Sequence, residues 1–69
     1  MITIAINAQL HTLDDPMSLL DLLQKELRIQ SLEHLAVAHN GEVVRREAYE
    51  GITVQDGDFL DLVEPVGGG

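Results

Sequence analysis

Alternation of apolar and other residues marks the start of the chain as a strand. Isoleucine occupies every second position of residues 2–6, the two-residue period of a half-buried strand. Asn7 and Ala8 predict a short turn, and residues 9–13 predict a second strand that completes a hairpin. Because its alternation is weaker, we expect this second strand at an edge of a sheet.

A helical pattern follows a break at residues 14–16, where two aspartates precede a proline. Ser18 is a suitable N-cap, since its hydroxyl can accept from a backbone N–H of the first turn. Leucines then recur at positions 19, 22, 23 and 27, a helical spacing that forms one apolar stripe. The pattern predicts a helix over residues 19–28 whose stripe belongs to the core.

A second hairpin is predicted in the middle of the chain. Residues 35–39 form its first strand and residues 42–44 its second, joined by Asn40 and Gly41. Asn-Gly is a strong hairpin signal because a type I′ turn needs positive φ at both central positions. Two hairpins around a helix indicate an α+β domain.

The segment after this hairpin has no clear period. Residues 45–47, Arg-Arg-Glu, are the one local cluster of positive charge. They predict a solvated loop, and the alternative is that the arginines contact a partner. Residues 48–54 predict an irregular segment that covers the sheet with the side chains of Tyr49, Ile52 and Val54. In residues 55–58, Asp56 and Asp58 flank a glycine and are interpreted as turn formers, not as an acid–base pair.

The last strand is predicted over residues 59–64. If Leu60 and Leu62 face the helix, then Phe59, Asp61 and Val63 face outward. The exposed apolar groups of Phe59 and Val63 suggest a docking surface. Pro65 cannot donate to a ladder and ends the strand. Val66, beside the tail, is a third candidate docking residue.

Three glycines end the chain: Gly67, Gly68 and Gly69. Without a Cβ they can pass through a narrow opening, and extended they reach about 10 Å. The entropy of ordering them predicts a flexible tail at 67–69 on a folded domain at 1–66. We expect this tail to carry a terminal carboxylate into the active site of another protein.

The composition restricts the classes of function that the chain can have. The chain has 69 residues, 12 acidic against 4 basic side chains and no cysteine. This charge argues against nucleic acid and for basic protein partners, and no spanning or leader segment is expected. The absence of cysteine fits a cytoplasmic protein and excludes a thiol nucleophile. His11, His34 and His39 are too irregularly spaced for a helical metal motif and are expected at the surface, so no metal or cofactor is expected.

The ordered set of motifs resembles the ThiS family, whose fold is the ubiquitin-like β-grasp. The motifs are the Ile-rich first strand and the segments 18–23 (SLLDLL), 36–44 (AVAHNGEVV), 54–58 (VQDGD) and 66–69 (VGGG). The resemblance implies a mixed sheet of four to five strands packed on one main helix. The chain departs from the family pattern in two places. It has a third glycine at its end, and it has Arg45 where a proline often precedes Arg-Glu in the family.

The resemblance also implies a sulfur carrier of thiamin biosynthesis that is not itself an enzyme. A ubiquitin-activating-like adenylyltransferase would use ATP to adenylate Gly69. Sulfur from a cysteine desulfurase or another donor would then give a C-terminal thiocarboxylate, which a thiazole synthase would consume. We expect the free carrier to be a monomer.

Three alternatives remain open from the residues alone. The first is the small subunit of molybdopterin synthase, which shares the fold and the tail; the lone Pro65 favours the thiamin interpretation over it. The second is a ubiquitin-like protein modifier. The third is a β-grasp interaction module with an inert tail.

Overall fold

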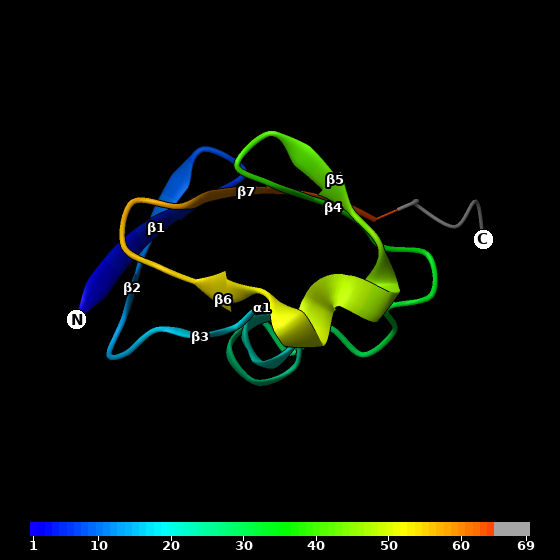
Figure 1. The fold of residues 1–69 in the computed structure, drawn as a ribbon, viewed down its shortest axis with the longest axis horizontal. Coiled ribbons are helices and arrows are strands. Elements are labelled where there is room, and N and C mark those ends of the chain that lie inside the picture. The colour runs from blue at the N-terminus through cyan, green and yellow to red at the C-terminus, as the bar shows by residue number, and fades with distance from the viewer. Residues whose placement is uncertain (65–69) are drawn as a thin grey trace.

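A five-stranded mixed sheet forms one side of the molecule in the computed structural model, which describes residues 1–64 (Figure 1). The strand order is β2-β1-β7-β4-β5, and β1 and β7 are parallel while the other neighbours are antiparallel. The strands are β1 (Ile2–Ile6), β2 (Gln9–Leu13), β4 (Ala36–His39), β5 (Glu42–Val44) and β7 (Phe59–Val63). The last strand in the sequence is therefore the central strand of the sheet. The predicted tail at 67–69 and the end of the predicted domain at 66 lie outside the described residues.

Both predicted hairpins are confirmed, with β2 at an edge as expected. Asn7 and Ala8 have φ of 50° and 67°, and Asn40 and Gly41 have φ of 51° and 87°. Positive φ at both central positions matches the right-handed twist of the flanking strands. The two-residue turns also fix the register, so that Ile6 pairs with Gln9 and His39 with Glu42.

The helix begins as predicted but ends earlier. The Ser18 hydroxyl accepts a hydrogen bond from the Asp21 N–H at 3.1 Å and caps α1 (Leu19–Asp21). The helix then widens into a π-helix, η1 (Leu22–Glu26). At its end the Leu27 N–H donates a hydrogen bond to Leu22 O. The predicted end at Arg28 is wrong, because Arg28 has a φ of 53° and leaves the helix. This turn brings Ile29 back toward the core.

A second, two-stranded sheet was not expected from the sequence. It pairs β3 (Met17–Ser18) with β6 (Thr53–Val54) beside the start of the helix (Figure 1). The predicted irregular segment at 48–54 is also wrong in part, since η2 (Arg46–Gly51) is a 3-10 helix that leads into β6. Two-residue strands are too short to show any period, and only their pairing across the fold defines them.

The core lies between the large sheet and the layer formed by the helices and the β3–β6 pair (Figure 1). Tyr49 and Val54 are buried there as predicted, while Ile52 is only half-buried. The inner face of β7 contributes Leu60 to the core. The buried residues are Ile2, Ile4, Ile6, Leu13, Leu19, Leu22, Leu23, Leu35, Val37, Tyr49, Val54 and Leu60.

Candidate docking face and terminal strand

Alternation along β7 places two apolar side chains in solvent. Leu60 is 1% exposed, whereas Phe59 and Val63 are 47% and 62% exposed. The outward orientation predicted for Phe59 and Val63 is therefore confirmed, although their role in docking stays a prediction. Val66, Gly67, Gly68 and Gly69 lie outside the described residues.

Strand pairing extends this exposed surface across the sheet. Ala5 of β1 lies between Leu10 and Phe59, and Ala38 of β4 pairs with Val43. Leu10 and Val43 are 78% and 84% exposed. We define the outer-face patch as Ala5, Leu10, Ala36, Ala38, Val43, Phe59 and Val63. The exposed Asp61, which pairs with Ala38, lies on the same face between Phe59 and Val63.

Sequence reasoning missed the contribution of the edge strands to the outer-face patch. The available signal was the register of the two hairpins. A two-residue turn at Asn7 and Ala8 pairs Ala5 with Leu10, and a turn at Asn40 and Gly41 places Val43 on the outer face. Exposed apolar side chains gathered on one face in this way are typical of a protein–protein contact.

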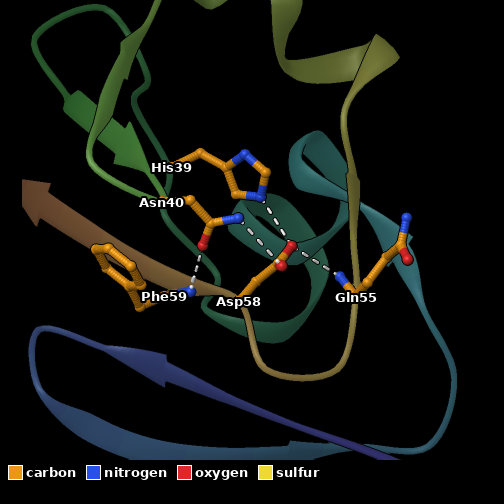
Figure 2. Close-up of polar contacts among 5 residues, drawn as sticks. All are labelled: His39, Asn40, Gln55, Asp58 and Phe59. Carbon is orange, nitrogen blue, oxygen red and sulfur yellow. Dashed lines mark hydrogen bonds and ion pairs between the residues drawn. The ribbon is translucent and has the colours of Figure 1, made fainter.

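A polar cluster holds the start of β7 (Figure 2). The Asp58 carboxylate accepts from Gln55 N–H at 3.0 Å and from Asn40 Nδ2 at 3.2 Å, and it contacts His39 Nε2 at 2.8 Å. Asn40 Oδ1 in turn accepts from the Phe59 N–H at 2.9 Å. The cluster thus joins the second hairpin turn to the loop before β7, directly beside Phe59.

Electrostatics favour the ionised form of Asp58. Burial raises the pKa of this carboxyl, but the hydrogen bonds from His39, Gln55 and Asn40 outweigh it, so the pKa lies below its usual 3.8. Of the three histidines expected at the surface, His34 is exposed, whereas His11 is half-buried and the side chain of His39 is 21% exposed. His39 is half-buried because its ring is held against Asp58.

The other predicted turn aspartate has a simpler role. Asp56 Oδ1 accepts from the Thr3 N–H at 2.8 Å, and Gly57 N–H donates to Thr3 O at 2.9 Å. Asp56 therefore ties the turn before β7 to β1. Asp56 and Asp58 both accept hydrogen bonds from backbone N–H groups at this turn, which agrees with their interpretation as turn formers.

A second asparagine holds the other end of β7. Asn7 Oδ1 accepts from Leu62 N–H at 2.8 Å, and Asn7 Nδ2 donates to Leu62 O at 3.2 Å. These bonds continue the β1–β7 pairing beyond its last paired residues, Ile6 and Leu60. The strand that leads into the C-terminal segment is thereby fixed to its neighbour almost to its end.

Within residues 1–64, no group of three or more His, Asp or Glu side chains is arranged to hold a metal ion. No helix in the same part of the chain is long and apolar enough to cross a membrane. The feature of residues 1–64 that is best suited to recognition is the outer-face patch.

A central last strand, a hairpin on each side of it and a helix packed beneath define a ubiquitin-like β-grasp protein of the α+β class. Solved structures with this arrangement include the crystal structure of the thiamine biosynthesis protein ThiS from Geobacter metallireducens. It has 31% sequence identity and a TM-score of 0.81, and the alignment covers 99% of this chain and 100% of that chain. The NMR solution structure of a thiamine biosynthesis protein from the same organism gives the same identity and TM-score, with 88% of that chain covered.

The family model of the ThiS family matches residues 4–69, nearly the whole chain. The chain therefore belongs to the ThiS family, which confirms the resemblance drawn from the sequence motifs. A search of curated proteins gave no match.

Proposed function

We propose that this protein is a sulfur carrier of thiamine biosynthesis whose terminal Gly69 is converted to a thiocarboxylate. The observation that carries the proposal is the ThiS-family match, which runs through the terminal Gly-Gly-Gly. The similar structures from Geobacter metallireducens, both of thiamine biosynthesis proteins, add support.

The chemistry of the terminus requires a partner enzyme. A terminal carboxylate has a pKa near 3.5, so at neutral pH it is an anion and a poor electrophile. In the proposed reaction a carboxylate oxygen attacks the α-phosphorus of ATP and displaces pyrophosphate. The resulting acyl adenylate is open to attack by sulfide at its carbonyl carbon. AMP then leaves with one former carboxylate oxygen, and the thiocarboxylate remains.

The folded domain would supply recognition and not catalysis. The outer-face patch is apolar and continuous with the end of β7, so a partner seated on it holds the strand from which residues 65–69 continue. We assign Phe59, Val63 and Val66 to docking and Gly67, Gly68 and Gly69 to the segment that enters the partner. The partners in this proposal are a ubiquitin-activating-like adenylyltransferase, a cysteine desulfurase or other sulfur donor, and a thiazole synthase.

The first experiment is the intact mass of the protein after incubation with ATP, the adenylating enzyme of the same cell and sulfide. We expect a mass gain equal to the replacement of one oxygen by sulfur, which requires ATP and is absent in a variant that lacks Gly69. No gain, with an enzyme proven active on its own carrier, would exclude the thiocarboxylate and favour a protein modifier or an inert module.

The client enzyme is decided by a second incubation. The thiocarboxylate form is mixed with a thiazole synthase or with the large subunit of a molybdopterin synthase. We expect loss of sulfur from the carrier with the thiazole synthase and its substrates. If the carrier loses sulfur with the molybdopterin synthase subunit and not with the thiazole synthase, it belongs to molybdenum cofactor synthesis instead.

Docking on the outer-face patch is tested by Phe59→Ser and Val63→Ser. Both changes remove exposed apolar surface, so we expect a higher KM for the carrier with little change in stability. Thr12→Ser is the control, since Thr12 is exposed on the edge strand β2 and lies outside the patch. Unchanged KM values in both patch variants would place docking elsewhere.

A further inference from the structure

A groove lies at the end of the large sheet, between the segment that precedes β4 and the turn from β5 into η2. Its apolar lining includes Leu35, Val44 and Tyr49, and its charged lining includes Arg45 and Arg46. Burial raises the pKa of Tyr49, and the charge of Arg46 partly offsets this rise. Tyr49 is buried, while both arginines remain exposed.

The two arginines are unusual in an acidic protein. Only four basic side chains oppose twelve acidic ones, and Lys25 is placed 3.7 Å from Asp21 on the helix. Within residues 1–64 neither Arg45 nor Arg46 forms an ion pair, although Glu33 and Glu47 also line the groove. Two adjacent cations are therefore available to a partner.

The groove is continuous with the outer-face patch. Ala36 and Val43 line both the groove and a shallow apolar hollow of the patch. Ala36 also pairs with Val63, the last residue of β7. In Figure 1 the turn from β5 into η2 lies at the same end of the molecule as the end of β7. A partner that covers the patch and receives residues 65–69 therefore reaches the two arginines.

We propose that Arg45 and Arg46 form a basic corner of the docking surface that binds an acidic segment, carrying Asp or Glu side chains, of the enzyme that activates the carboxylate. The inference rests on the proposed function. An enzyme that binds ATP needs basic groups for its phosphates, and these attract an acidic carrier in many orientations. Two adjacent arginines without an ion pair in residues 1–64 distinguish one orientation from the others, because complementary charge fixes the register of an interface.

The test compares two double variants of the full chain that have the same net charge. The first is Arg45→Glu with Arg46→Glu, and the control is Lys25→Glu with Arg28→Glu, which changes the other two cations and leaves the groove intact. The rate of ATP-dependent thiocarboxylate formation is measured against carrier concentration, at low and at high salt. Circular dichroism verifies that both variants are folded.

We expect the corner variant to raise the KM for the carrier at least about tenfold, with kcat changed less than about twofold. The control should stay within about threefold of the wild type, and high salt should reduce the difference between the two variants. Single Arg45→Lys and Arg46→Lys variants should keep most of the wild-type KM, since charge is the property required.

Equal KM values in the two double variants would overturn the basic corner and leave only a net-charge effect. A loss confined to sulfur transfer to the thiazole synthase would also overturn it, because the acidic segment would then belong to the other enzyme. Neither result touches the proposed thiocarboxylate, which is excluded only if the wild-type chain gains no sulfur.

Discussion

The two hairpin turns on either side of β7 share one local chemistry and differ in what they support. Asn7 and Asn40 both have φ near 50°, and the side-chain amide of each bonds to the backbone of β7. Asn7 bonds at Leu62, whose side chain packs against the core, whereas Asn40 bonds at Phe59 on the exposed face. An asparagine in a turn can therefore fix the backbone of β7 beside a core residue or beside a residue of the docking face.

The turns also differ in how far their contacts extend. Within residues 1–64 the Asn7 amide bonds to the backbone of Leu62 and to no other group. The Asn40 amide also donates to Asp58, which contacts His39 and the Gln55 N–H. Because the second turn is part of a network, its disruption should spread to Phe59, while disruption of the first should stay local.

Asp58→Ala should be the most damaging change to this network. The change removes the carboxylate that accepts from Gln55 N–H and Asn40 Nδ2 and that contacts His39. The Asp58 side chain is only 15% exposed, so water replaces these contacts poorly. We expect a loss of about 2–3 kcal/mol in the free energy of unfolding, measured by urea denaturation. Asp56→Ala, which removes the single contact to Thr3 N–H, is the control and should cost about 1 kcal/mol. Equal losses would contradict a network at Asp58.

The charge of Asp58 should account for part of that loss. Its pKa is lower in the folded state than the usual 3.8, so its ionised form stabilises the fold above that pH. This contribution is lost as the pH falls below 3.8 through the folded pKa. Urea denaturation at pH 7 and near pH 3 should show a smaller difference in Asp58→Asn than in the wild type. A difference of the same size would mean that His39 and Asn40 bond equally well to a neutral group.

Glycine at either asparagine separates the two turns directly. Asn7→Gly and Asn40→Gly both keep positive φ accessible and remove only the amide, so each should cost about 1 kcal/mol. Under the proposed function, Asn40→Gly should also raise the KM of the carrier, because Phe59 loses its N–H partner. Asn7→Gly should leave KM unchanged at a temperature where both variants are folded. Equal KM values would show that Phe59 does not depend on the turn.

Substitutions at the second position of each turn should have effects of opposite sign. Ala8 has a φ of 67°, which disfavours a residue with a Cβ, so Ala8→Gly should stabilise the fold by about 0.5 kcal/mol. Gly41→Ala should destabilise it by about 1 kcal/mol, because its φ is 87°. A Cβ there would meet the Phe59 ring only at 4.0 Å, an ordinary contact, so the loss comes from the backbone. Thermal denaturation of both variants tests the opposite signs.

The sequence by itself determined the elements with a strong local signal. The isoleucine alternation, the two positive-φ turns, the Ser18 cap and the outward direction of Phe59 and Val63 all follow from local sterics and period, and the structure agrees. The motif set and the terminal glycines also identified the family before any contact was known.

Tertiary structure decided what depends on residues far apart in the chain. The β3–β6 pair has too few residues for a period, and the π-helix ends at Glu26, before the predicted end, with Arg28 at positive φ and Ile29 packed against the core. The contact between His39 and Asp58 joins two turns that share no local pattern. The outer-face patch and the basic corner likewise exist only once β7 lies between β1 and β4. The physical reason is that a two-residue strand, a helix end or a shared surface is stabilised by its partner and not by its own sequence.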